Sequence, residues 1–233
     1  MTDKRENLPK LIPHGDRAVD AVFENVIAPE VNARVIALGK AVTEAKKAGI
    51  VGCTPAYRTL TVEYDPLTVT YGQVCLFLRG LLGKELAPAE GRLVRIPVLY
   101  GGGEGPDLAD VAKHAEMTEE EVISRHTARE YPVYMIGFMP GFPYLGGLDP
   151  AIACPRRSVP RTRVEGGSVG IAGTQTGVYP APSPGGWNII GRTPLALFDE
   201  ERLSLLCAGD RVRFVPIDRE KFNDIAENGR WEM

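Results

Sequence analysis

Cysteine and histidine are scarce in this chain of 233 residues, which has four cysteines and three histidines. The cysteines, Cys53, Cys75, Cys154 and Cys207, lie far apart and form no Cys-x-x-Cys pair. Structural zinc sites and small disulfide scaffolds both depend on closely spaced ligands or on paired cysteines. The sequence therefore predicts no metal site and favours reduced thiols in a cytoplasmic protein.

The sequence also lacks an apolar run that would cross a membrane. The uncharged stretch 131–148 contains four glycines and three prolines, and it is shorter than the roughly 20 residues that a spanning helix needs. Residues 1–11 carry several charges and have no apolar core, so they do not resemble a secretory signal. We expect a cytoplasmic protein without a membrane partner.

A strong charge and a phosphate-binding loop are missing as well. The 27 basic and 30 acidic residues give a net charge of −3, which is no footprint for binding nucleic acid. The motif Gly-x-x-x-x-Gly-Lys-Ser/Thr does not occur, and residues 80–84 are followed by Glu85 where a hydroxyl would bind magnesium. We expect no nucleic-acid partner and no autonomous ATP site.

The first ninety residues have the pattern of a small α+β domain. Apolar residues from Val31 to Ala45 recur at steps of three and four behind Pro29, which predicts a helix that begins at Pro29 and ends at Gly49. Thr70 and Gln73 form a capping box that opens a second helix. Strands are expected at residues 17–24, 50–54, 57–64 and 93–100. The order β-α-β-β-α with a possible closing strand predicts a ferredoxin-like domain over residues 1–90.

The rest of the chain, residues 91–233, differs in composition and in its pattern of apolar residues. Residues 137–191 contain 12 glycines and eight prolines, which favour short strands joined by tight turns. Strands are expected at residues 131–136, 168–173, 187–190, 194–198 and 211–216, and short helices at 203–208 and 219–227. Many short strands of this kind predict a second domain that is a closed β-barrel or a sandwich.

Arginines gather in the glycine- and proline-rich region. Arg156, Arg157, Arg161 and Arg163 fall within eight residues, and residues 155–192 hold five arginines against one acid, Glu165. Guanidinium groups bind carboxylates and phosphates through two parallel hydrogen bonds, so this loop is a candidate site for an anionic substrate or an acidic partner. A solvated loop explains the same pattern equally well.

His126 is the one histidine with a suggestive position, at the end of the helix that Thr118 and Glu121 are expected to cap. Histidines near helix C-termini commonly complement the helix dipole, and this structural role is favoured. A general base needs a substrate proton within hydrogen-bond reach, which a sequence does not reveal. His126 is nevertheless the candidate acid or base that the chain offers.

The segment from Phe138 to Tyr144 places aromatic residues between prolines and glycines. Such a segment does not alternate like a strand, so part of it is expected to line a groove or a partner-facing patch. An ordered loop folded over one end of the barrel is the alternative.

Several runs in this region resemble the allophanate hydrolase subunit 1 family, which covers subdomains C and D of a carboxyltransferase domain. They are residues 133–149 (VYMIGFMPGFPYLGGLD), 167–173 (GSVGIAG), 175–180 (QTGVYP), 184–187 (PGGW) and 190–194 (IGRTP). The family includes the B subunit of the bacterial 5-oxoprolinase and the inhibitor of a sporulation sensor kinase.

This resemblance implies a ferredoxin-like N-terminal domain followed by a cyclophilin-like β-barrel. It also implies that the protein is active only with two partners, an allophanate hydrolase subunit 2 family protein (the C subunit of 5-oxoprolinase) and the A subunit of 5-oxoprolinase. The implied reaction opens 5-oxoproline to L-glutamate with hydrolysis of ATP, and ATP with magnesium would bind at the level of the complex. A histidine-kinase inhibitor and subunit 1 of an allophanate hydrolase or urea carboxylase system are the alternatives.

The matching runs also indicate candidate site residues, all on the barrel. Arg163, Arg192, Gln175 and Thr176 are candidates for binding a substrate or another anion. The candidates for docking a partner are Phe138, Pro140, Phe142, Tyr144 and Trp187. A cyclophilin-like fold does not imply prolyl isomerase activity, because function depends on the site and not on the fold.

Overall fold

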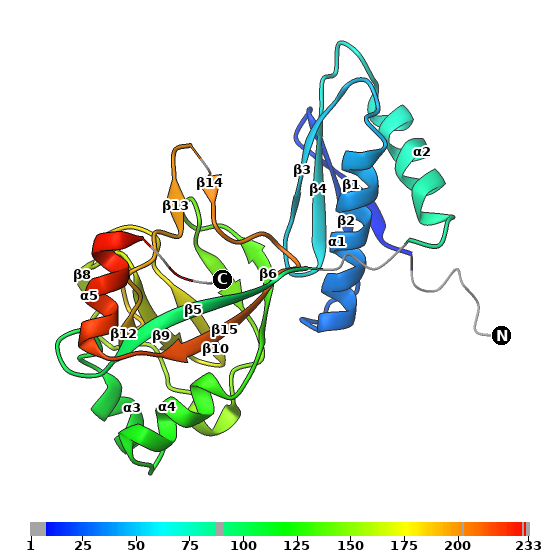
Figure 1. Ribbon diagram of the computed structural model, residues 1–233. Coiled ribbons are helices and arrows are strands. Elements are labelled where there is room, and N and C mark those ends of the chain that lie inside the picture. The colour runs from blue at the N-terminus through cyan, green and yellow to red at the C-terminus, as the bar shows by residue number, and fades with distance from the viewer. Residues whose placement is uncertain (1–7, 87–90, 202, 230, 232–233) are drawn as a thin grey trace. The chain divides into compact units, whose positions relative to one another are not determined.

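The computed structural model describes residues 8–86, 91–201, 203–229 and 231 (Figure 1). The chain divides between residues 90 and 91 into two compact units. Residues 1–7, on which the expectation about a secretory signal largely depends, lie outside the described residues. In the part of the chain that is described, no helix is long and apolar enough to cross a membrane.

The first unit is a four-stranded antiparallel sheet with two helices. Its elements are β1 (Lys10–His14), β2 (Ala18–Val22), α1 (Pro29–Glu44), β3 (Ile50–Pro55), β4 (Thr59–Tyr64) and α2 (Tyr71–Leu82), and the strand order is β1-β2-β4-β3. Pro29 opens α1, and the capping box of Thr70 and Gln73 opens α2 as predicted. Both helix starts are confirmed because they depend only on local chemistry.

One face of this sheet is buried and the other is polar. Val19 lies opposite Val62 in the register of β2 and β4, and Ala21 lies opposite Leu60, so these four pack into one core with α1 and α2. On the other face, Thr61 donates a hydrogen bond to Asp20 at 2.7 Å. The alternation of apolar and polar residues in β4 therefore has the predicted consequence.

The outer strand of the sheet differs from the prediction. Residues 93–100 do not close it; they form β5 (Leu93–Tyr100) in the second unit, where Val94, Ile96 and Val98 belong to the barrel core. The edge position is taken by β1, which pairs with β2 through a tight turn at Gly15. Sequence reasoning missed β1 because its residues are mostly exposed, so they show no apolar alternation.

The second unit is built around a closed seven-stranded barrel. After β5 come α3 (Leu108–His114), α4 (Glu119–Thr127), β6 (Tyr131–Ile136), β7 (Pro143–Leu145), the 3-10 turn η1 (Pro150–Ile152), β8 (Arg161–Val164), β9 (Ser168–Ala172), β10 (Gln175–Val178), β11 (Ser183–Gly185), β12 (Asn188–Arg192), β13 (Phe198–Asp199), β14 (Leu203–Ser204), β15 (Arg211–Pro216) and α5 (Arg219–Asn228). The barrel order is β10-β7-β6-β15-β5-β12-β9, so the predicted α+β chain with a C-terminal barrel is confirmed.

The barrel is closed by strands far apart in the sequence. β5 and β15 lie parallel, with Leu93 opposite Arg211 and Val98 opposite Pro216. Helices α3 and α4 lie together at one end of the barrel (Figure 1). Their buried residues, among them Leu108 and Val122, join the barrel core.

Two local predictions in this unit are wrong. The strand expected at 194–198 shrinks to β13, and the helix expected at 203–208 is instead the short strand β14 followed by a turn. The backbone N–H of Leu205 donates to the carbonyl of Leu197, and the N–H of Cys207 donates to the Asp210 carboxylate. These bonds use donors that a helix would need, and Leu206 is buried in the barrel core, so tertiary packing overrides the local propensity.

Candidate functional site

A hollow in the surface of the second unit gathers four of the five residues predicted to dock a partner. This hollow, here called the aromatic cleft, has a volume of about 360 Å³. It is lined by Phe138, Phe142, Tyr144, Arg156, Arg157, Pro160, Tyr179, Pro184, Gly185, Gly186 and Trp187. The lining comes from loops and short strands that are distant in the sequence, so the closed barrel brings them together.

Phe142 is the centre of the aromatic walls. Its ring lies edge-to-face with Phe138, Tyr144, Tyr179 and Trp187, with centroid distances of 5.5, 5.2, 5.5 and 5.6 Å. Edge-to-face pairs contribute about 0.5–1.5 kcal/mol each beyond their buried area. Because Phe142 is only 2% exposed, it supports the cleft from beneath and offers little surface to a partner.

Gly177 on β10 lets this aromatic cluster pack closely on the barrel. A β-carbon at Gly177 would lie 3.1 Å from the indole of Trp187 and 3.2 Å from the ring of Phe142. Both distances are tighter than ordinary van der Waals contact, so a side chain here would push the rings outward. The run QTGV therefore contributes a close approach of backbone to the cleft.

Phe138 differs from the other rings because it lies on the surface. Its side chain is 66% exposed, and its backbone has a positive φ of 69°, which is uncommon for an aromatic residue. An exposed ring in a strained conformation next to a cleft is a feature of binding surfaces more than of cores.

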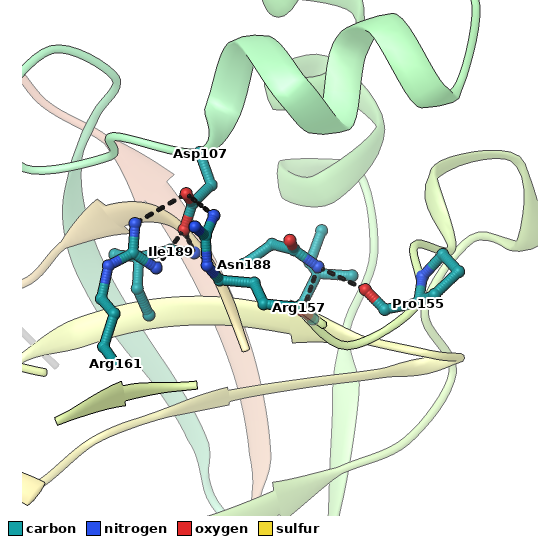
Figure 2. Close-up of polar contacts among 7 residues, drawn as sticks. Asp107, Pro155, Arg157, Arg161, Asn188 and Ile189 are labelled. Carbon is teal, nitrogen blue, oxygen red and sulfur yellow. Dashed lines mark hydrogen bonds and ion pairs between the residues drawn. The ribbon is translucent and has the colours of Figure 1, made fainter. Parts of the chain in front are cut away.

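The arginines of this region are organised by one buried carboxylate. Asp107, which is 2% exposed, accepts hydrogen bonds from Arg157 at 2.6 Å and from Arg161 at 2.7 and 2.8 Å (Figure 2). The backbone N–H of Ile189 donates to the same carboxylate at 2.7 Å, and the N–H of Asp107 donates to the Ile189 carbonyl at 2.9 Å. Figure 2 shows both guanidinium groups converging on this carboxylate. We call Asp107, Arg157 and Arg161 the arginine clamp.

Arg156 stands beside the clamp without a partner of its own. Within the described residues it is exposed and makes no ion pair or hydrogen bond. It lies near the phenol of Tyr179, whose pKa is raised by burial and lowered in part by a hydrogen bond from the Trp187 backbone and by Arg156. The cleft therefore has a cation at its edge that is free to meet an anion.

His126 lies in the barrel and not in the cleft. It is fully buried, its Nε2 is 2.9 Å from Thr176 Oγ1, and its Nδ1 is 2.7 Å from the Tyr100 hydroxyl. Thr176 donates its own hydrogen to the Gly170 carbonyl at 3.0 Å, so it accepts from His126 Nε2–H. Nδ1 then accepts from Tyr100, which makes His126 a neutral imidazole with both nitrogens satisfied.

Burial holds His126 in this neutral form. It lowers the pKa of His126 from its ordinary value to about 3, because a charged ring in the apolar core loses its hydration. The ring also stacks on Phe214 at a centroid distance of 4.5 Å. The predicted role of His126 as an acid or base stays a prediction, and this closed, fully satisfied position favours a structural role.

The other predicted residues separate into two groups. Trp187 and Tyr144 line the cleft with Phe138 and Phe142. Thr176 is instead fully buried against His126 in the barrel, and its strand neighbour Gln175 is half-buried. The predicted anion-binding residues Arg163 and Arg192, and the docking candidate Pro140, do not line the cleft.

The two arginines outside the cleft have partners of their own. Arg163 pairs with Glu165 at 2.6 Å on the surface. Arg192 donates to the carbonyl of Gly166 at 2.9 Å and lies 3.5 Å from Glu104. Their roles as anion-binding residues stay predictions, and the arginines next to the cleft are Arg156 and Arg157 instead.

Sequence reasoning missed Asp107 and Tyr179. Asp107 stands directly before α3, where it reads as a helix cap, but its side chain makes no capping bond. Its arginine partners lie 50 and 54 residues further along the chain, and no local pattern connects them. The excess of arginine over acidic residues in 155–192 was the sequence signal that pointed to a carboxylate partner elsewhere in the chain.

Among the described residues, no group of three or more histidine, cysteine, aspartate or glutamate side chains is placed to hold a metal ion. The aromatic cleft has no acidic residue in its described lining, so it offers no carboxylate ligand for magnesium. The cleft fits an anion with an apolar or planar body better than it fits a metal-bound nucleotide.

Comparison with known proteins agrees with the motifs. Residues 9–207 match the family model "Carboxyltransferase domain, subdomain C and D". A relative from Bacillus subtilis (strain 168), the B subunit of a 5-oxoprolinase, is 44% identical over 227 residues, which cover 91% of this chain and 95% of the relative. The 5-oxoprolinase B subunit of Escherichia coli O157:H7 is 46% identical over 72% of this chain and 78% of its own length.

Solved structures share the fold. The crystal structure of TTHA0988 is 40% identical with a TM-score of 0.78, and the match covers 87% of this chain but only 40% of the TTHA0988 chain. The Kluyveromyces lactis urea amidolyase, at 20% identity and a TM-score of 0.75, matches 98% of this chain and 16% of its own, and it shows the fold alone. The family match over 9–207 confirms the resemblance read from the motifs: the chain belongs to the family of the carboxyltransferase domain, subdomains C and D.

Proposed function

We propose that this chain is the B subunit of an ATP-dependent 5-oxoprolinase, which opens the lactam 5-oxoproline to L-glutamate with hydrolysis of ATP. The observation that carries the proposal is the 44% identity to the 5-oxoprolinase B subunit of Bacillus subtilis, over 91% of this chain and 95% of that protein. Identity of this level over nearly full length supports a shared role more strongly than a shared fold does.

The chain is proposed to act only with partner subunits. Cleavage of an unreactive lactam by way of phosphoryl transfer needs a nucleotide and a magnesium ion. The described residues contain no group of three or more histidine, cysteine, aspartate or glutamate side chains that could hold a metal ion. We therefore assign ATP and magnesium to the complete assembly, which adds the A subunit and an allophanate hydrolase subunit 2 family protein as the C subunit. The TTHA0988 chain, of which this chain matches 40%, supports the idea that the same unit works next to a second one.

We interpret the two units as a ferredoxin-like domain over residues 1–90 and a cyclophilin-like barrel over 91–233. In the first unit α1 joins β2 to β3 across β4, which is the split βαβ arrangement of that fold. Its outer strand precedes this arrangement in the sequence, as β1, instead of following it. The free cysteines among the described residues, including the half-buried Cys53 and the exposed Cys207, support a reducing, cytoplasmic location.

The test is reconstitution. The chain is co-expressed with its candidate partners, purified by a tag on this chain, and assayed for phosphate release with and without 5-oxoproline. We expect phosphate release that depends on 5-oxoproline and on the presence of this chain. A purified assembly that releases no phosphate with 5-oxoproline would overturn the proposal.

The alternatives give different results in the same preparation. A component of a urea-degrading system would leave 5-oxoproline untouched and respond to a urea-derived substrate. An inhibitor of a histidine kinase would bind the helical dimerisation domain of a kinase, and the exposed Phe138 is the ring that such a complex would cover. Stable association with a kinase together with no turnover would favour that class.

A further inference from the structure

We propose that the aromatic cleft is a binding site for a small planar amide or lactam that bears a carboxylate, and that Arg156 and Arg157 bind the carboxylate. The choice of 5-oxoproline as the probe rests on the proposed function. The site itself is argued from its own residues.

The charges around the cleft favour an anion. The arginine clamp contains two cations, Arg157 and Arg161, and one anion, Asp107, and the exposed Asp110 also interacts electrostatically with Arg161. The uncompensated charge is that of Arg156 at the cleft edge, where no acidic residue lines the described surface. Rings alone would also suit a cation, because aromatic faces attract positive charge. Two arginines next to them exclude a cationic ligand and attract a carboxylate.

Arg157 is held in place and still has donors to give. One of its terminal nitrogens donates to Asp107 at 2.6 Å, and the carboxylate is fixed in turn by the Ile189 backbone. The Nε–H of Arg157 is buried and has no partner within the described residues. The Arg157 side chain as a whole is 32% exposed, so a ligand oxygen would meet the accessible part of the guanidinium and not the buried Nε–H. A guanidinium ordered before binding also loses less entropy when the ligand arrives.

The rings determine the rest of the ligand. The exposed ring of Phe138 and the half-buried ring of Tyr144 give the cleft its accessible apolar surface. Tyr179 and Trp187 are only 2% and 7% exposed and support these rings from behind, at an interplanar angle of 79° to each other. A flat amide or lactam ring packs on such faces, whereas a bulky saturated ligand does not. The volume of about 360 Å³ lies at the lower end of the range for ligand sites, roughly 300–1,000 Å³, so a small molecule is indicated.

The first experiment reads binding from Trp187, which lines the cleft. Trp231, the second of the two tryptophans, is changed to Phe so that Trp187 is the sole indole emitter. The full chain is titrated with 5-oxoproline and with 2-pyrrolidinone, which has the same lactam ring but no carboxylate. We expect a saturable change in Trp187 fluorescence with 5-oxoproline and a response at least tenfold weaker with 2-pyrrolidinone.

The variant that tests the anion contact is Arg156→Gln, because Arg156 makes no ion pair in the described structure and its loss should leave the fold intact. The matched control is Arg211→Gln, which removes an exposed arginine paired with Glu130 at 2.7 Å on β15. We expect Arg156→Gln to weaken 5-oxoproline binding at least tenfold, which is the loss of about one charged hydrogen bond, and Arg211→Gln to leave it unchanged.

The assembled complex gives the second, independent measurement. If the cleft binds substrate, the complex with Arg156→Gln has a KM for 5-oxoproline raised at least tenfold, while the Arg211→Gln complex keeps the ordinary KM. Equal KM values for the two complexes would overturn the cleft proposal and leave the proposed function standing. If no complex turns over 5-oxoproline, the proposed function fails, and the Trp187 titration then decides the cleft: no saturable response would overturn it.

Discussion

Asp107 and Arg157 lie 50 residues apart in the chain, yet the Arg157 guanidinium donates to the Asp107 carboxylate over 2.6 Å. The carboxylate is nearly inaccessible to solvent, and it faces Arg161 and the Ile189 backbone as well. The pair therefore joins the start of α3 to the loop that forms one side of the aromatic cleft. A buried acid that satisfies two cations and a backbone donor is expected to affect stability and cleft geometry together.

Replacing Asp107 with Asn is the first prediction. Asn keeps the shape but removes the negative charge, so Arg157 and Arg161 face each other uncompensated and an amide group meets donors. Breaking a buried pair costs roughly 3–5 kcal/mol, and the partial exposure of both arginines reduces this, so we expect a loss of about 3 kcal/mol. The measurement is the free energy of unfolding in urea.

The control for this change is Asp110→Asn, three residues further along and exposed in the first turn of α3. Asp110 acts on the helix dipole and on Arg161 through space, but it makes no ion pair in the described structure, so the expected loss is below about 1 kcal/mol. Equal losses for the two variants would contradict the role assigned to Asp107.

The pH dependence of stability is the second prediction, and it depends on His126. Its pKa in the folded protein is lowered to about 3, while an unfolded histidine titrates near its ordinary value of 6.5. Below pH 6.5 the unfolded chain takes up a proton on this histidine, whereas the folded chain does not. The contribution of His126 to the free energy of unfolding is therefore fully present above pH 6.5 and is lost as the pH falls. Between pH 7 and pH 5 this histidine alone should lower the free energy of unfolding by about 2 kcal/mol.

His126→Gln separates this effect from those of the carboxylates. Its amide can still accept and donate one hydrogen bond each, but it does not titrate. Urea unfolding at pH 7 and pH 5 should show a decline for His126→Gln that is about 2 kcal/mol smaller than for the unchanged chain. His114→Gln, which removes an exposed histidine from the end of α3, should keep the full decline. The same decline in the unchanged chain and both variants would contradict a neutral, buried His126.

Local chemistry explains which parts of the molecule could be predicted. The capping boxes at Thr70 with Gln73 and at Thr118 with Glu121 need only four consecutive residues, and both are present in the structure. The glycine- and proline-rich composition predicted a barrel or a sandwich, and the family resemblance favoured the barrel. The family resemblance depended on contiguous runs, which a sequence displays directly.

Long-range pairing explains what could not be predicted. The assignment of residues 93–100 to the barrel depends on β15, more than 110 residues away, so a strand pattern alone did not decide which sheet it joins. The burial of His126 depends on Tyr100 and Thr176, and the clamp depends on Asp107 meeting arginines 50 and 54 residues away. None of these contacts leaves a periodic signal in the sequence.

The third prediction concerns the support of His126. Thr176→Val keeps the size of the side chain but removes the acceptor of His126 Nε2–H and the donor to Gly170. A buried donor left without a partner costs about 1–3 kcal/mol, so we expect a loss of about 2 kcal/mol in the free energy of unfolding. Thr176→Ser keeps the hydroxyl and should cost about 1 kcal/mol or less, from one lost methyl group. Equal losses in the free energy of unfolding for Thr176→Val and Thr176→Ser would show that packing, and not the hydrogen bond, is the contribution of Thr176 to stability.

The close approach of β10 to the aromatic walls supplies the fourth prediction. Gly177→Ala places a methyl group 3.1 Å from the Trp187 indole, 3.2 Å from the Phe142 ring and 3.1 Å from the Pro143 carbonyl oxygen, so the rings or the neighbouring strand must shift. Overpacking of this kind costs about 1–3 kcal/mol, and we expect a loss of this size in the free energy of unfolding, with a change in Trp187 fluorescence.

Gly72→Ala is the contrasting change, because its β-carbon meets no atom within 4 Å in the first turn of α2. There the lower entropy of the unfolded chain should raise stability by about 0.5–1 kcal/mol. Unchanged stability and fluorescence in Gly177→Ala would mean that the cleft walls yield freely, which would also weaken the case for a preformed ligand site.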